Sequence, residues 1–206
     1  SYTGLKEFKI SKKSLKIAQR EILQGNIIIH STDTLPGLAV DATNDYALKR
    51  LIKLKGRGGP FSIIVASIDM ISRYSFVSKI NAAKINEILP GPYTVLLKNN
   101  ESNNLSSYVT DQSKLVGFRI PKHSFSQNLV KSLNQPIVTT SFNITGQKSI
   151  LELEKVSEHF KEIVIFDDEK RDPSKGSTIL DLSQRNMKII RKGDGGLPIW
   201  KPILEF

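Results

Sequence analysis

The sequence predicts an α/β fold, a single-domain, twisted, open mixed sheet with flanking helices. Along the 206 residues, apolar runs of strand length alternate with segments that carry an apolar residue every three or four positions. This alternation is typical of helices layered on a sheet. Near the end of the sequence, strand-like runs follow one another without a helix between them, which predicts antiparallel pairs and therefore a mixed sheet.

The expected helices begin at residues that can cap them. Ser11, Asn44 and Ser78 each precede an apolar stripe of helical period, and a Pro-Gly-Pro sequence at 90–92 ends the third of these helices. Leu48 and Leu51 are expected to face inward from the second helix. The helices expected are 11–25, 44–56, 78–89, 124–133 and 151–160.

The expected strands are short and rich in apolar and β-branched residues. Two polar stretches, 98–107 and 167–176, have the length of ordinary loops, and a strand resumes after each. We therefore expect one domain over residues 1–206. The strands expected are 26–30, 61–67, 93–97, 115–120, 136–141, 163–166, 177–182 and 187–191.

Composition excludes several classes of protein. No apolar run approaches the roughly 20 residues that span a bilayer, so we expect no membrane association and a cytoplasmic protein. Without cysteine and with only three scattered histidines, disulfides, thiol chemistry and a structural zinc site are not expected, and we predict no resident metal. The net charge of +10 favours an anionic partner or serves solubility alone.

Five regions at expected strand ends carry polar or basic residues that suit an anion or a nucleotide. They are HSTDTLPGL at 30–38, KGRGG at 55–59, GFRIP at 117–121, TTSFNITG at 139–146, and GSTILDL with IIRKGDGG at 176–182 and 189–196. The usual dinucleotide, P-loop and nucleophile-elbow glycine motifs are missing from the sequence. The residues alone therefore indicate an anion or nucleotide site on an α/β sheet.

Each region also has a purely structural interpretation. Lys55 and Arg57 are expected at an exposed loop, where they bind phosphates or merely follow a helix that ends at Gly56. Arg119 could face solvent from its strand, or project into a cleft and grip a carboxylate. Ser141 and Asn143 could bind phosphate or ribose, or either could cap a turn.

Taken in order, the motifs resemble the YrdC-like family of threonylcarbamoyl-AMP synthases, in its short single-domain form. Seven pieces match the family pattern over about residues 25–193: STDTLPGL, the K-G-R at 55–57, LPGPYTVLL, GFRIP, TTSFNITG, GSTILDL and IIRKG. The resemblance implies a sheet with a concave, basic face. It also implies synthesis of threonylcarbamoyl-AMP and pyrophosphate from L-threonine, bicarbonate and ATP, with Mg²⁺ accompanying the ATP.

Further implications of the resemblance concern the product and the site. The product would serve the threonylcarbamoyladenosine modification of tRNA, through a separate transfer complex. Lys55 and Arg57 would offset charge that develops during adenylyl transfer. The implied ATP-binding residues are Lys55, Arg57, Ser141, Asn143, Ser149 and Arg191, and the implied threonine-binding residues are Thr32, Arg119 and Ser177.

Some positions depart from the family pattern. Only Gly58 and Gly59 separate Arg57 from Pro60, which shortens the loop, and Phe142 replaces a small residue. Two alternatives therefore stay open: a non-catalytic protein that binds double-stranded RNA or tRNA, or a paralogue of the same fold acting on another carbamoyl compound. Asn143 favours the synthase, because drifted paralogues often lose that asparagine.

Overall fold

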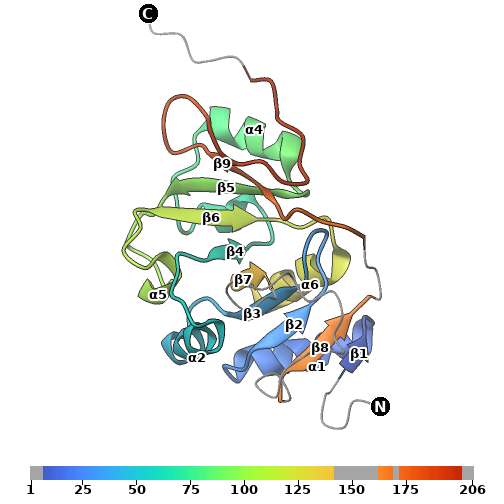
Figure 1. The fold of residues 1–206 in the computed structure, drawn as a ribbon. Helices are drawn as coiled ribbons and strands as arrows, with labels where there is room; N and C mark the ends of the chain where they lie inside the picture. The colour runs from blue at the N-terminus through green and yellow to red at the C-terminus, as the bar shows by residue number, and fades with distance from the viewer. Residues whose placement is uncertain (1–6, 142–161, 169–171, 201–206) are drawn as a thin grey trace, which may run out of the picture.

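The protein, as a computed structural model, is described over residues 7–141, 162–168 and 172–200. Within these ranges the strands form one mixed sheet in the order β1-β8-β2-β3-β7-β4-β6-β5-β9-β10, with helices around it (Figure 1). The strands are β1 Glu7–Lys9, β2 Ile28–His30, β3 Gly37–Asp41, β4 Ser62–Ile64, β5 Tyr93–Lys98, β6 Leu115–Arg119, β7 Ile137–Ser141, β8 Val164–Asp167, β9 Thr178–Asp181 and β10 Lys188–Arg191. The predicted mixed α/β sheet is confirmed.

Local capping chemistry sets the starts of the helices, as predicted. The Ser11 side chain accepts from Ser14 N at the start of α1, and Asn44 and Ser78 cap α2 and α4 in the same way. Gly56 ends α2 with φ +72°, a left-handed conformation that glycine adopts without strain. The helices are α1 Lys12–Leu23, α2 Asp45–Lys55, α3 Ile68–Ile71, α4 Lys79–Ile88, α5 Ser107–Thr110 and α6 Ser124–Leu133. The helix expected at 151–160 lies outside the described residues.

Several elements differ from the prediction. β3 was not predicted, yet all its residues are buried and it pairs antiparallel with both β2 and β7. β1 was not predicted, and it exists as an edge strand paired parallel with β8. β4 is shorter than expected: it ends at Ile64, and Ser67 caps α3, which begins at Ile68. α5 was not predicted and begins at Ser107, where the expected loop ends. The predicted antiparallel pair near the end is confirmed as β9 and β10.

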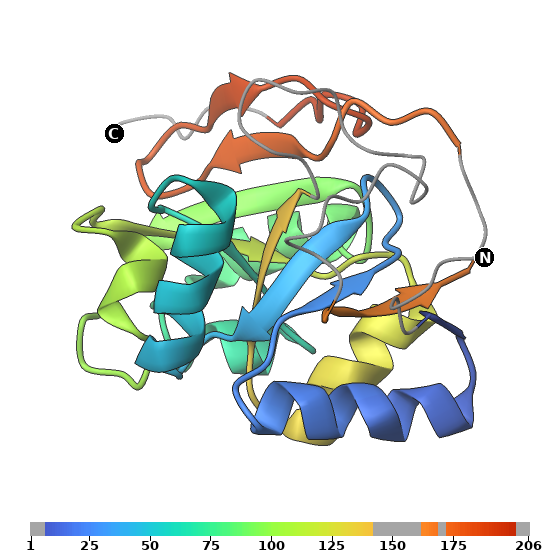
Figure 2. The ribbon, with the colours of Figure 1, turned by 60° about the horizontal axis from the view of Figure 1, so that its bottom comes forward.

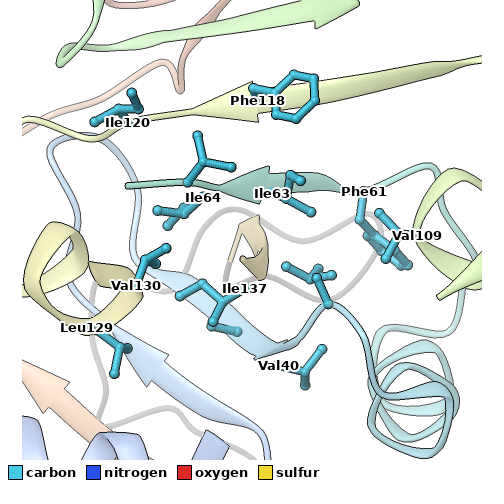
Figure 3. Close-up of a cluster of buried hydrophobic side chains, with 14 of the residues drawn as sticks. Val40, Phe61, Ile63, Ile64, Val109, Phe118, Ile120, Leu129, Val130 and Ile137 are labelled. Atoms are coloured by element: carbon cyan, nitrogen blue, oxygen red, sulfur yellow. The ribbon is translucent and has the colours of Figure 1, made fainter. Parts of the chain in front are cut away.

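The core lies between the sheet and the helices. α1 and α6 lie side by side, and α2 lies against α5 (Figure 2). Ile64, Ile137 and Val130 meet between β4, β7 and α6 (Figure 3). Leu48 and Leu51 are fully buried, as predicted for α2. No helix among the described residues is long and apolar enough to cross a membrane.

Candidate functional site

Strand register gathers polar side chains on one face of the sheet. Residues directly opposite each other on paired strands share a face, and side chains alternate along each strand. Thr139 lies opposite Ser62, Ile64 opposite Arg119, and Thr94 opposite Ile179. A pocket of about 240 Å³ opens on this face. Its polar and basic lining comes from five strands (β4, β5, β6, β7 and β10) and from connecting segments: Thr34, Arg57, Ser62, Thr94, Arg119, Thr139, Thr140, Ser141, Ser177 and Arg191.

Charge makes this pocket suitable for an anion. Arg57, Arg119 and Arg191 line it, and no aspartate or glutamate occurs in its lining within the described part of the chain. Gly117 leaves room on the same face, because a Cβ there would lie only 3.0 Å from Ser62 Oγ and 3.1 Å from Thr94 Cγ2. The pocket is therefore a polar cavity with an excess of positive charge.

Arg119 is buried in the pocket wall instead of facing solvent. Its Nη2 donates to Asp33 Oδ1 at 2.7 Å, and its Nη1 donates to Thr34 Oγ1 at 3.3 Å. Its Nε is buried and has no hydrogen-bond partner. A buried donor without an acceptor costs free energy. Of the two possibilities for Arg119, facing solvent or lining a cleft, the structure supports the second.

Lys55 corrects one expectation. It is the last residue of α2 and only 3% exposed, so the prediction of an exposed loop position is wrong. The final turn of α2 directs its side chain inward, where Nζ donates to the Ser141 carbonyl at 2.9 Å. Burial, and secondarily the charge of Arg57, lower the pKa of Lys55 to about 8. Lys55 therefore supports the pocket wall at Ser141 and is not itself part of the described lining.

Arg57 is exposed, as predicted, and reaches across to the sheet. Its Nη2 donates to Thr140 Oγ1 at 3.4 Å, and its guanidinium lies 5.7 Å from the centre of the Phe61 ring. The shortened loop that follows packs tightly: a Cβ on Gly59 would lie 3.0 Å from the carbonyl oxygens of Tyr108 and Val109. The two glycines therefore let the loop pass close to the backbone of α5.

Arg191 and Ser177 meet at the opposite rim of the pocket. Arg191 Nη2 donates to the Ser177 carbonyl at 2.8 Å and to Ser177 Oγ at 3.3 Å. Ser177 Oγ also lies 2.7 Å from Thr94 Oγ1, which ties β9 to β5. Burial lowers the pKa of Arg191, the charge of Arg119 lowers it further, and Asp194 opposes both effects. Ser177 and Arg191 thus form one hydrogen-bonded unit.

Thr32 is not brought to this pocket. Its Oγ1 accepts from Thr34 N at 3.0 Å and donates to the Leu35 carbonyl at 2.7 Å, so it closes a local turn. Thr34 occupies the pocket wall instead. The Thr-Asp-Thr sequence indicated a threonine hydroxyl at this site, but it did not show whether the side chain of Thr32 or that of Thr34 lines the pocket. Asn143, Ser149 and Phe142 lie outside the described residues, so their predicted roles stay predictions.

A second cavity of about 210 Å³ adjoins the pocket at Thr34, which lines both, and its lining includes Asp33, His123 and Asp168. His123 Nε2 lies 2.9 Å from Asp168 Oδ2. His30 is fully buried next to this region, and burial, with the charge of His123 as the second cause, lowers its pKa to about 4. No group of three or more His, Cys, Asp or Glu side chains in the described ranges could hold a metal ion.

Fold and site together define an α/β protein with a pocket of polar and basic lining on its sheet. The Sua5/YciO/YrdC family model, described as "Telomere recombination", matches residues 20–193. The chain therefore belongs to this family, and the family prediction is confirmed.

Individual relatives agree with this assignment. The chain is 31% identical to the threonylcarbamoyl-AMP synthase of Bos taurus over 88% of this chain and 68% of that protein. It is also 31% identical to the threonylcarbamoyl-AMP synthase of Pseudoalteromonas atlantica, over 78% and 93% of the two chains. Among solved structures, P. abyssi Sua5 complexed with L-threonine matches with a TM-score of 0.80 at 26% identity. The match covers 92% of this chain but only 57% of that one.

Proposed function

We propose that this protein is a threonylcarbamoyl-AMP synthase, which forms threonylcarbamoyl-AMP and pyrophosphate from L-threonine, bicarbonate and ATP. One observation carries the proposal: the pocket presents three arginines and no described carboxylate, with Arg119 Nε buried and lacking an acceptor. All three substrates bring anionic groups to such a pocket. The relatives named threonylcarbamoyl-AMP synthase support the same activity.

The roles assigned to the residues follow from their positions. Arg119 would hold the threonine carboxylate, and the Ser177–Thr94 pair would offer hydroxyls nearby. Arg57 and Arg191, at opposite rims, would bind the phosphates. Lys55 would add positive charge below Ser141, while Ser141 lines the pocket itself. Asn143 and Ser149 keep the ATP-binding roles that the family resemblance implies.

The chemistry asks the protein mainly to place two anions close together. The threonine nitrogen attacks the carbon of bicarbonate with loss of water, giving a carbamate. A carbamate oxygen then attacks the α-phosphorus of ATP, and pyrophosphate leaves. Arginine side chains beside the phosphates would stabilise the charge that accumulates on the leaving group. Magnesium would enter with ATP, held by phosphate oxygens and water, since the described lining offers it no carboxylate.

Downstream steps belong to the same proposal. The product would pass, in the cytoplasm, to a separate transfer complex that modifies adenosine next to the anticodon of tRNA. Synthesis itself needs no contact between this protein and RNA. We also propose that residues 1–206 act as one domain.

Pyrophosphate release from ATP, measured with and without L-threonine and bicarbonate, tests the proposal. We expect release that requires both, and its absence from a preparation that binds ATP would refute the activity. The Arg57→Ala variant should lose ATP affinity about tenfold or more, the scale of a charge-assisted hydrogen bond, without losing its fold. Arg50→Ala is the matched control, because Arg50 is also exposed but lies on α2 away from the pocket lining. Tight RNA binding unchanged by Arg57→Ala, without pyrophosphate release, would favour the RNA-binding alternative.

A further inference from the structure

The carboxylate of Asp33 contacts Arg119 and lines the second cavity, and it is not part of the pocket lining. We propose that Asp33 is a positioning residue, which fixes the direction in which Arg119 meets the carboxylate of the amino-acid substrate. This inference rests on the proposed function and adds a residue that contacts Arg119 and not the substrate.

The two carboxylate oxygens of Asp33 accept hydrogen bonds from two places: the end of β6 and the segment that follows it. Oδ1 accepts from Arg119 Nη2 at 2.7 Å, and Oδ2 accepts from the backbone N–H of Lys122 at 2.9 Å. The side chains of Arg119 and Asp33 are 7% and 10% exposed, so solvent screens this ion pair little. With both oxygens engaged, the carboxylate has one orientation, and it imposes one orientation on the guanidinium.

The segment that carries Asp33 is itself anchored. Ser31 N donates to the Phe166 carbonyl at 3.0 Å, and Ser31 Oγ donates to Asp167 Oδ1 at 3.2 Å. Immediately after Asp33, the Thr34 N–H donates to Thr32 Oγ1 and closes the turn. Asp33 therefore lies in a turn that is anchored to β8 through Ser31 and closed by the side chain of Thr32. The hydroxyl of Thr32 thus stabilises the turn that carries Asp33.

The location of Asp33 shows whether it orients Arg119 or competes with the substrate for it. A carboxylate inside the pocket would compete with the substrate for Arg119, and its removal would tighten binding. Asp33 lines the second cavity and is not part of the pocket lining, whereas Arg119 is. Nη2 is therefore held by a carboxylate that does not line the pocket, Nη1 lies against Thr34, and Nε has no acceptor. Removing Asp33 should therefore weaken the binding of a carboxylate.

The test is calorimetric titration of the full chain with L-threonine, with L-threoninol, which lacks the carboxylate, and with ATP. For Asp33→Asn we expect threonine to bind about tenfold more weakly, the scale of one charge-assisted hydrogen bond. Binding of threoninol and of ATP should stay within about twofold of wild type. A purely structural defect would lower all three affinities together, and unchanged or tighter threonine binding would overturn the proposal.

Matched variants make the result specific. Asp172→Asn removes a carboxylate from the same cavity without touching Arg119, and it should leave threonine binding unchanged. In an Arg119→Ala background, Asp33→Asn should have no further effect on threonine binding, because the two residues act as a unit. If Asp33→Asn is not recovered folded, Asp33→Glu keeps the charge but displaces the carboxylate, and it should weaken threonine selectively. Wild-type protein that binds neither threonine nor ATP would instead refute the proposed function, and this inference with it.

Discussion

Replacing Lys55 with methionine should stabilise the fold at neutral pH and weaken ATP binding. Lys55 keeps a charge in a position that is only 3% exposed, and its pKa falls from 10.5 to about 8 as a result. Methionine has a similar length and no charge, so it removes the desolvation cost while filling the same space.

The size of the gain follows from the pKa of Lys55. At about 1.4 kcal/mol for each tenfold change in proton affinity, keeping the charge costs on the order of 3 kcal/mol. Losing the hydrogen bond to the Ser141 carbonyl, and leaving that carbonyl without this donor, offsets about 1–2 kcal/mol. A net stabilisation of roughly 1–2 kcal/mol remains, which raises Tm by about 3–6 °C in a protein of this size.

The sign of the pH dependence gives a sharper test. Between about pH 8 and pH 10.5 the unfolded chain holds a proton on Lys55 that the folded protein has lost. Wild-type stability therefore rises with pH across this window. The advantage of Lys55→Met should be full below about pH 8. As the pH approaches 10.5 it should turn into a deficit of about 1–2 kcal/mol, because the charge cost has gone and only the loss of the hydrogen bond to Ser141 remains.

Urea denaturation followed by circular dichroism at about pH 7 and about pH 10 measures this difference. Lys53→Met is the matched control, because Lys53 is exposed on the same helix and should give almost no change. In parallel, calorimetry should show a loss of ATP affinity of about tenfold for Lys55→Met. A variant less stable than wild type at both pH values, or a difference independent of pH, would refute the account of Lys55 as a strained buried charge.

Two further predictions concern the pocket rim and the region behind it. Gly193→Ala should weaken threonine and ATP binding together and lower Tm, because a Cβ there would collide with the carbonyl oxygens of Gly176 and Ser177; Gly196→Ala, with open space at its Cβ, should do neither. Because the pKa of His30 is about 4, against 6.5 for an unperturbed histidine, the unfolded chain binds more protons between these values, and wild type should lose about 3 kcal/mol of stability as pH falls from 6.5 to 4. The His30→Gln variant should lose measurably less stability over the same pH range, as measured by the midpoints of urea denaturation. Equal losses in the two proteins would contradict a buried, neutral His30.

The starts of three helices could be predicted because their capping residues and the groups they bind are close together in the sequence. Ser11, Asn44 and Ser78 cap their helices through side-chain bonds to residues three positions on, so the sequence contains both partners close together. α6 was predicted with the same bounds because its apolar period is regular. β3 was missed for the opposite reason: it is buried throughout, so it shows no alternation, and the Pro-Gly before it is typical of a turn.

Residue order in the sequence could not show which side chains turn inward. Lys55 is buried because Ser141, which lies 86 positions away, offers it a carbonyl. Arg119 likewise has its ion-pair partner 86 positions away in Asp33, so neither its burial nor the role of Asp33 follows from the strand pattern. The family resemblance named Arg57, Arg119, Ser141, Ser177 and Arg191, which the structure brings to one pocket. It also named Thr32, which the structure assigns to a turn.

The pocket takes its walls from residues as far apart as Thr34 and Arg191, and β9 closes it by pairing with β5. During synthesis on the ribosome, a chain that has not yet released β9 and β10 has no Ser177–Arg191 rim. Substrate binding should therefore begin only once the residues up to Arg191 have emerged, and no shorter nascent chain could hold ATP and threonine in a productive arrangement. Ligand present at 100 times its Kd would then add about 2.7 kcal/mol to the stability of those molecules alone in which β9 has paired with β5. A ligand that recognises only the closed pocket would selectively stabilise chains that have completed this pairing.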